Sequence, residues 1–167
     1  MKLTSPVNSW RVTSPFGPRW GRMHNGVDIG VPSGTITRAP RSGKVLSAGF
    51  FDNDCGGTIV IEHSNPFGAG KISTAYCHMR AINVKKGESV RKGEVIGETG
   101  GISNEKGAGN SLGPHLHFGI KVNGKWEDPD KYFEQGVLKS GTGTRTIVLL
   151  VYVGALSYVL YSLLKKR

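Results

Sequence analysis

The motif His115-Leu116-His117 is the sharpest chemical signal in the sequence. In a β-strand, residues two apart point to the same face, so the two imidazoles would lie side by side. Leu116 and Phe118 would then point the other way, into apolar surroundings. Two imidazoles on one face are costly to bury when charged, and a metal ion resolves this because it binds the neutral form. A pair of surface histidines would fit this short motif equally well.

A second candidate is the segment His24-Asn25-Gly26-Val27-Asp28. Gly26 and the following Pro32 argue against a helix. In an extended segment, residues four apart share a face, which would place His24 and Asp28 together. A turn aspartate beside an exposed histidine is the alternative interpretation of this segment.

The two motifs together offer imidazole nitrogens and a carboxylate oxygen. This set is typical of catalytic zinc, which takes three protein ligands and keeps a fourth position open for water. The imidazoles disfavour an all-oxygen Mg²⁺ or Ca²⁺ site. Non-haem Fe(II) uses the same donors, so the ligand types leave iron open.

The remaining histidines and the cysteines carry weaker signals. His78 lies at the end of a predicted strand, where a lone histidine is more often structural than catalytic, and His63 has no partner that the sequence identifies. Cys55 and Cys77 form no CxxC motif. We interpret them as free thiols, while a disulfide between a loop and a neighbouring strand stays open because the sequence does not fix their distance.

Short strands separated by turns dominate the elements that would position these residues. Runs rich in β-branched and apolar residues, each bounded by Gly, Pro, Asn or Asp, predict strands at 44–49, 58–63, 72–78 and 115–122. Pro129 to Phe133 could start one short helix. The sequence therefore predicts an all-β fold, an antiparallel sandwich or partly open barrel.

The chain carries 22 Lys and Arg against 12 Asp and Glu, which gives a formal net charge of +10. Such a balance favours an acidic partner: nucleic acid, anionic lipid or a cell-wall polymer. No helix-turn-helix and no aromatic-rich RNA-binding motif is visible, so we expect no nucleic-acid partner.

Composition divides the chain into a domain at 1–138, a flexible polar linker at 139–145, an apolar segment at 146–164 and a basic tail at 165–167. The 19 residues from Thr146 to Leu164 contain no charge. As a helix they would extend roughly 30 Å, the thickness of a bilayer core, which predicts a transmembrane helix and a lipid partner. The first six residues lack an apolar stretch, so we expect no secretory signal peptide, and little room for an autoinhibitory segment before Trp10.

Several blocks, in order, closely resemble the lysostaphin/LytM family of zinc endopeptidases and cover nearly all of residues 10–133. They are Thr13-Ser14-Pro15-Phe16-Gly17-Pro18-Arg19 with His24-Asn25-Gly26-Val27-Asp28-Ile29-Gly30, Ala39-Pro40 through Gly43-Lys44-Val45, Thr58 to His63 with Tyr76-Cys77-His78-Met79, Val84 to Gly97, and Gly113 to Phe118 with Asp128-Pro129. So many ordered matches are far more specific than any one motif.

The resemblance implies an antiparallel sheet with a groove above it. It implies that His24, Asp28 and His117 bind zinc and that His115 and His78 are the two catalytic histidines that do not. Cys77 departs from the family's usual alanine, next to the site, without removing a functional group.

The substrate class that the resemblance implies is the peptide part of bacterial peptidoglycan. The alternative is a membrane-anchored binding or activator module of the same fold without activity, which the complete His/Asp set argues against. A membrane-lesion protein working through the apolar segment is a third hypothesis. A membrane-tethered wall hydrolase fits a bacteriophage, so we expect a single-pass protein of a virion membrane or of the host cell membrane, acting in entry or lysis.

Overall fold

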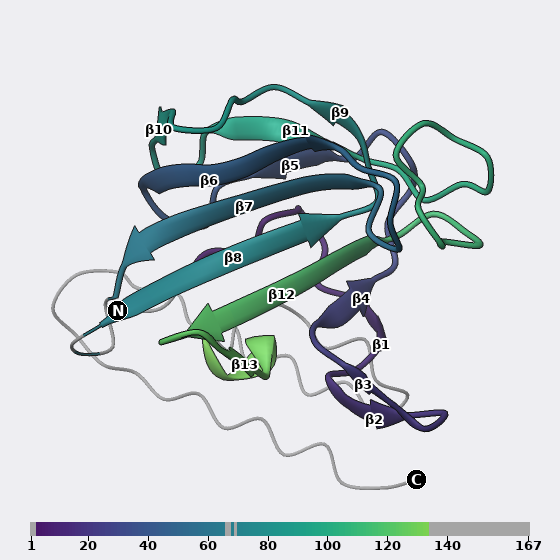
Figure 1. The fold of residues 1–167 in the computed structure, drawn as a ribbon, viewed down its shortest axis with the longest axis horizontal. Helices are drawn as coiled ribbons and strands as arrows, with labels where there is room; N and C mark the ends of the chain where they lie inside the picture. Colours follow the sequence, from purple (N-terminus) through teal and green to yellow (C-terminus); the bar gives the residue numbers. More distant parts are fainter. Residues whose placement is uncertain (1–2, 66–67, 69, 134–167) are drawn as a thin grey trace, which may run out of the picture.

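The structure is a computed structural model that describes residues 3–65, 68 and 70–133. One large antiparallel sheet runs through the molecule in the order β1-β4-β12-β8-β7-β6-β10, and β13 pairs with the outer part of β12 (Figure 1). Its strands are β1 (Val12–Ser14), β4 (Val27–Ile29), β6 (Gly43–Phe50), β7 (Gly57–Ser64), β8 (Lys71–Cys77), β10 (Ser89–Val90), β12 (Leu116–Val122) and β13 (Lys125–Glu127).

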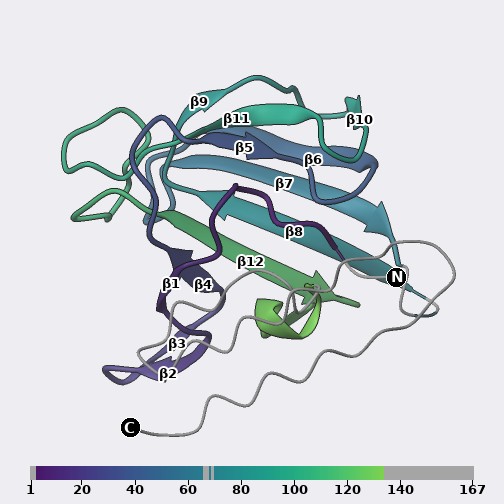
Figure 2. The same cartoon turned by 180° about the vertical axis from the view of Figure 1, so that it is seen from behind.

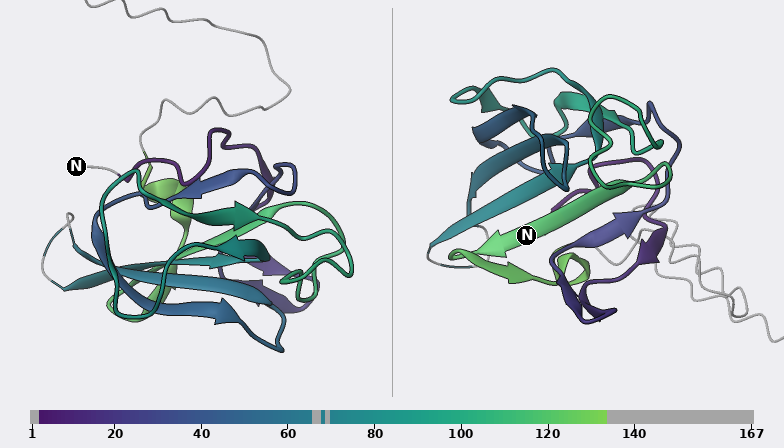
Figure 3. Two further views of the ribbon diagram at one scale, coloured as in Figure 1. Left: turned by 90° about the horizontal axis from the view of Figure 1, so that it is seen from above. Right: turned by 45° about the vertical axis from the view of Figure 1, so that its right-hand side comes forward.

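Two smaller sheets complete the described part of the chain. A three-stranded sheet in the order β5-β11-β9 packs near β6 and β7, and the hairpin β2–β3 projects beside β4 (Figures 2 and 3). The strands are β2 (Gly17–Arg19), β3 (Arg22–His24), β5 (Ile36–Arg38), β9 (Met79–Ile82) and β11 (Val95–Thr99). A single 3₁₀ turn, η1 (Pro129–Lys131), follows β13, with Asp128 as its N-cap.

Strand alternation separates a buried face of the large sheet from an open one. Ile59 and Ile61 of β7, Tyr76 of β8 and Leu116 and Phe118 of β12 are each no more than 1% exposed and form the centre of the core. The intervening positions of the same strands, such as Thr58, Ser73 and His117, are only partly covered. Because residues two apart share a face, the polar side chains gather on the open side.

The prediction of an all-β, antiparallel fold is confirmed. The four predicted strands correspond to β6, β7, β8 and β12, and the expected short helix is a single 3₁₀ turn. The transmembrane helix expected at 146–164, with its linker and tail, lies outside the described residues. Among the residues that the structure describes, no helix has both the length and the apolar character needed to cross a bilayer.

Candidate metal centre and its cleft

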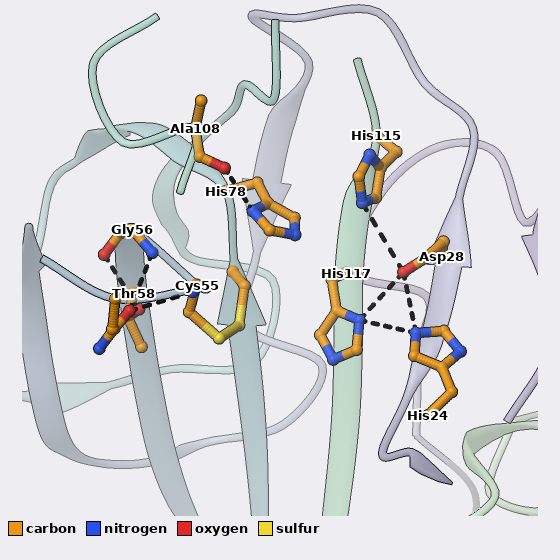
Figure 4. Close-up of a disulfide and its surroundings, with 11 residues drawn as sticks. His24, Asp28, Cys55, Gly56, Thr58, His78, Ala108, His115 and His117 are labelled. Atoms are coloured by element: carbon orange, nitrogen blue, oxygen red, sulfur yellow. Dashed lines mark hydrogen bonds and ion pairs between the residues drawn. A yellow bond between two sulfur atoms is a disulfide. The ribbon is translucent and has the colours of Figure 1, made fainter. Parts of the chain in front are cut away.

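Three side chains from three strands converge on one point of the open face. His24 comes from the end of β3, Asp28 from β4 and His117 from β12 (Figure 4). His24 Nε2 lies 3.1 Å from Asp28 Oδ1 and 3.0 Å from His117 Nδ1, and His117 Nδ1 lies 2.9 Å from Asp28 Oδ1. Neighbouring ligand atoms of a tetrahedral zinc site lie roughly 3.3 Å apart for bonds of about 2.0–2.1 Å. The spacing therefore fits a small ion with little adjustment.

The sheet register explains this convergence. His117 lies directly opposite Asp28 across the β12–β4 pair. His24 and Asp28 were expected to share a single extended stretch, and here the sequence interpretation is incomplete. The chain bends at Asn25 and Gly26, so His24 pairs within the β2–β3 hairpin while Asp28 belongs to the large sheet.

Hydrogen bonds to residues outside the cluster hold the side chains of His24 and Asp28 in place. His24 Nδ1 lies 2.7 Å from the Pro15 carbonyl oxygen, to which it donates, so Nε2 is the ring nitrogen that faces Asp28. Asp28 Oδ2 accepts from Arg19 Nη1 at 3.0 Å, which leaves Oδ1 toward the histidines. Burial alone would raise the pKa of Asp28, but hydrogen bonds from His117 and His24 and their charges outweigh burial and hold that pKa well below its ordinary value.

His78 and His115 face each other at the other side of this cluster, with ring centroids 4.7 Å apart. His78 Nδ1 lies 2.7 Å from the Ala108 carbonyl oxygen, and His115 Nδ1 lies 2.9 Å from that of Gly113. Both rings donate through Nδ1, which leaves Nε2 of each neutral ring as the acceptor nitrogen. His115 Nε2 lies 3.7 Å from Asp28 Oδ1, so His115 borders the cluster without joining it.

Burial lowers the pKa of His78 to about 4, and the neighbouring charge of His115 acts in the same direction. His78 is therefore neutral at pH 7 and able to accept a proton. Its backbone has a positive φ of 61°, between the end of β8 and the start of β9. This left-handed residue turns the chain from the large sheet into the small one.

Cys55 and Cys77 form a disulfide, with Cα atoms 4.7 Å apart, so the interpretation as free thiols is wrong. Cys77 ends β8, and Cys55 lies in the turn that precedes β7 and folds back over that end. The sequence could not show this approach because it depends on the path of the β6–β7 connection.

The five residues proposed for the site lie together in a cleft of about 650 Å³. Its walls include Trp20 at the tip of the β2–β3 hairpin and Leu112 in the loop before β12, each 91% exposed. A second hollow of about 410 Å³ continues past His117 over β7 and β8 toward Trp126. Both hollows are lined by His24, Cys55 and His117, so they meet beside the candidate metal-binding residues.

Sequence reasoning missed the residues that support the site. The sequence motif that contains Arg19 gives this residue no separate role, while Pro15 and Ala108 act through backbone carbonyls that any residue type carries. Ser111, whose hydroxyl lies 3.2 Å from His115 Nδ1, lies in an irregular loop without periodicity. A basic residue a few positions before the His-Asp motif is the one signal that could have indicated Arg19.

Comparisons with known proteins find similar sequences and similar structures. A model of peptidase family M23 matches residues 22–129. The peptidoglycan DD-endopeptidase ShyC of Vibrio cholerae is 35% identical over 134 residues, 76% of this chain and 28% of ShyC. This chain spans little more than a quarter of the length of the first curated relatives that it matches.

Solved structures resemble the described fold as well. A zinc-containing peptidase from Vibrio cholerae superposes with a TM-score of 0.65 at 31% identity, over 77% of this chain and 39% of that one. The catalytic domain of lysostaphin from Staphylococcus simulans superposes with a TM-score of 0.63 at 30% identity, over 74% of this chain and 91% of that domain. The resemblance seen in the sequence motifs is thereby confirmed.

Proposed function

Because the chain belongs to peptidase family M23, we propose that it is a zinc-dependent endopeptidase that hydrolyses peptide bonds in the cross-links or stem peptides of bacterial peptidoglycan. One observation carries the proposal: the ligand atoms of His24, Asp28 and His117 converge, while His78 and His115 lie beside them with Nδ1 engaged by a backbone carbonyl. The name of the relative ShyC, a peptidoglycan DD-endopeptidase, supports the substrate class.

The residues present fit a zinc ion. His24 Nε2, Asp28 Oδ1 and His117 Nδ1 would hold it, with a donor set typical of catalytic zinc. A zinc ion held there would lower the pKa of a water molecule toward about 7 and would polarise a carbonyl group. Arg19 orients Asp28 through its other oxygen, and the Pro15 carbonyl orients His24.

His78 and His115 supply the proton chemistry. Each keeps its proton on Nδ1, held by a backbone carbonyl, so Nε2 accepts a proton from the attacking water. After that transfer the ring is an imidazolium that donates from Nε2, to the developing oxyanion or to the leaving amine. Two such rings on one side of the cleft allow one to act as base and the other as donor.

Elemental analysis and activity measured on the same preparations test the proposal. We expect about one zinc per full-length chain, purified in detergent without chelator, and release of soluble fragments from purified peptidoglycan. His117→Ala and Asp28→Ala should lose both zinc and activity. His78→Ala and His115→Ala should keep zinc and lose roughly 10²–10⁴-fold in rate. Glu62→Gln, which breaks an exposed ion pair with Lys71, is the matched control and should change neither.

Several outcomes contradict the proposal. Absence of a transition metal would remove the metalloenzyme claim. Zinc with no hydrolysis would favour the alternative, an inactive binding or activator module of the same fold. Parental rates for His78→Ala, or loss of metal from His115→Ala, would show that their roles are misassigned.

For the setting, we propose a single-pass protein tethered by residues 146–164, encoded by a bacteriophage and placed in the virion membrane or the host cell membrane. Support comes from the uncharged 19-residue segment and its polar linker. The disulfide supports a peptidase domain facing an oxidising compartment. Capsid and packaging genes beside the coding sequence are the expected finding, and a purely cellular neighbourhood would contradict the phage origin.

A further inference from the structure

The disulfide lies beside the metal ligands, at the point where the sheet meets the loops of the cleft (Figure 4). Cys77 is the register partner of His117, which pairs on its other side with Asp28. The next residue, His78, donates its backbone N–H to the Cys55 carbonyl at 2.8 Å. The bond therefore joins the strand end that carries His78 to the turn that holds the His78 backbone.

The turn at Cys55 is also braced against the loop that precedes β12. Asn110 N donates to the Asp54 carbonyl at 3.0 Å, and Gly57 N donates to that of Gly107 at 2.9 Å. At Gly109, with φ of 56°, a Cβ atom would collide with the backbone of Asp54, so no side chain separates the two segments. A shift of the turn must therefore move the loop.

The loop that precedes β12 contacts the side chains of both His78 and His115. The Ala108 carbonyl accepts from His78 Nδ1 at 2.7 Å and from the Ser111 backbone N–H at 3.1 Å. Ser111 Oγ lies 3.2 Å from His115 Nδ1. A continuous path of contacts thus runs from the disulfide through Ala108 to the side chains that face the metal cluster.

His78 depends on these contacts because its backbone has a left-handed conformation that a non-glycine residue does not favour. Since this conformation, with φ of 61°, is unfavourable, the surroundings must hold His78 there. Without the cross-link, the turn and His78 are free to relax together, while the sheet that carries His117 and Asp28 stays paired.

We propose that the Cys55–Cys77 disulfide is a positioning device that holds His78 in its working place, so that the hydrolytic rate depends on the redox state of this bond. The proposal rests on the proposed function in that hydrolysis is one of its readouts. The metal ligands lie on paired strands, so reduction slows the reaction without emptying the metal site. In a reducing compartment the chain would accordingly remain at a low rate.

The bond is open to a reductant, since Cys55 is half-buried and lines both hollows of the cleft. A water-soluble phosphine supplies two electrons and becomes the phosphine oxide. Water provides the oxygen and the two protons, and the disulfide becomes two thiols. A small-molecule disulfide reverses the change by exchange, leaving as two thiols. The chain contains two cysteines, so any effect of the phosphine on the protein's thiols arises at this bond.

The experiment compares the full-length chain in detergent in its oxidised, reduced and reoxidised states with the Cys55→Ala/Cys77→Ala variant. Reduction should lower kcat by at least about tenfold, because displacement of a reacting group by about 1 Å can cost 10²-fold. KM should change little and the zinc content should stay constant. Amide hydrogen exchange should quicken at residues 51–57, 78 and 105–111 and stay slow at 116–122. Reoxidation should restore the rate, and the variant should have the lower rate with and without phosphine.

The outcomes separate this inference from the proposed function. If mass spectrometry shows complete reduction while kcat and exchange at residue 78 are unchanged, the inference is overturned. Loss of zinc or of the near-ultraviolet dichroism on reduction would overturn it too, since the bond would then hold the fold rather than His78. An oxidised chain that does not hydrolyse peptidoglycan refutes the proposed function, and hydrogen exchange then decides the positioning role alone.

Discussion

Three of the four histidines in the cleft are fixed in one tautomer by a backbone carbonyl. His24, His78 and His115 all donate through Nδ1, to Pro15, Ala108 and Gly113. His117 is the exception, because its Nδ1 points into the cluster. For His24, His78 and His115, a main-chain oxygen therefore decides which ring nitrogen carries the proton. The sequence does not indicate this, because every residue type has a backbone carbonyl.

At Gly26 the site has no space for a side chain. A Cβ atom there would lie 2.6 Å from the Phe118 carbonyl oxygen and 2.8 Å from His117 Nε2. The carbonyl belongs to a paired strand, so the His117 ring must give way. Gly26→Ala should weaken zinc binding by about 10–100-fold, the range seen when the support of a metal ligand is disturbed. Competition with a chromophoric chelator measures this affinity.

Gly49→Ala is the control for that variant. Its new methyl group would meet only the partly exposed ring of Phe51, at 3.3 Å, which can move aside. Zinc affinity should stay at the parental value. Equal affinities in Gly26→Ala and the parent would show that His117 does not need its present position to bind metal.

The residue types of the site were predictable, and part of their geometry was too. Strand alternation correctly placed His115 and His117 on one face with Leu116 and Phe118 buried behind them. The pairing of His24 with Asp28 depends on a bend between two short strands, and no periodicity in sequence reveals such a bend. Ligand and catalytic roles came from the family resemblance.

Among the elements, length decided what could be predicted. The four strands of seven or eight residues, β6, β7, β8 and β12, carry enough alternation to be identified from sequence. Strands of two or three residues, such as β1, β5 and β10, show no period and are defined only by their partners. The hairpin β2–β3, which carries His24, belongs to this second class.

His63 illustrates how an element hides a polar residue. The sequence offered no partner, but the side chain is buried beneath the large sheet, with Nδ1 3.1 Å from the Ser42 carbonyl oxygen and Nε2 2.9 Å from Thr74 Oγ1. Thr74 Oγ1 lies 3.0 Å from the Tyr76 hydroxyl. This network lies in the core and supplies no group to the candidate metal site.

Burial lowers the pKa of His63 below 6.5, and the charge of Arg41 adds to this, while hydrogen bonds to Ser42 and Arg41 oppose it. The unfolded chain takes up a proton near pH 6.5 that the folded chain refuses, so His63 removes stability as the pH falls below that value. Below pH 6.5, each further pH unit lowers the free energy of unfolding by at most about 1.4 kcal/mol through His63. His63→Gln, which does not titrate, should show a shallower loss of unfolding free energy between pH 6.5 and 5 in urea titrations.

The other titratable groups are the same in both proteins, so the difference between the two curves reports His63 alone. Identical slopes for the parent and His63→Gln would contradict a lowered pKa. A steeper loss in the variant would mean that the folded state prefers the charged ring.

At the scale of the whole molecule, the first described residues pack against the last ones at the hydrophobic core. Leu3 bridges to Phe133 and donates its N–H to the Tyr132 carbonyl at 2.9 Å, and Trp10 packs against Phe133 with centroids 4.1 Å apart. The elements from Leu3 to Phe133 thus enclose one hydrophobic cluster. This closure motivates the expectation that the peptidase domain ends close to residue 138.

The apolar segment at 146–164 provides the test of that organisation. Its 19 uncharged residues match one bilayer crossing, and the Gly/Ser/Thr linker at 139–145 would decouple it from the domain. Removing residues 140–167 should therefore give a soluble, folded domain with unchanged activity on isolated wall fragments. The full-length chain should need detergent and should float with liposomes.

A charge placed at the middle of the segment gives a matched full-length control. Leu156→Arg should weaken the association with liposomes, because an arginine at the centre of a membrane helix costs about 2.5–3.5 kcal/mol for insertion. Its activity on soluble wall fragments should equal that of the parent. A core helix packed on the domain predicts the reverse pattern, since truncation would expose the apolar surface of the sheet and cause aggregation. A full-length chain that stays monomeric in plain buffer, together with a truncated chain that unfolds, would exclude the membrane anchor and the setting proposed from it.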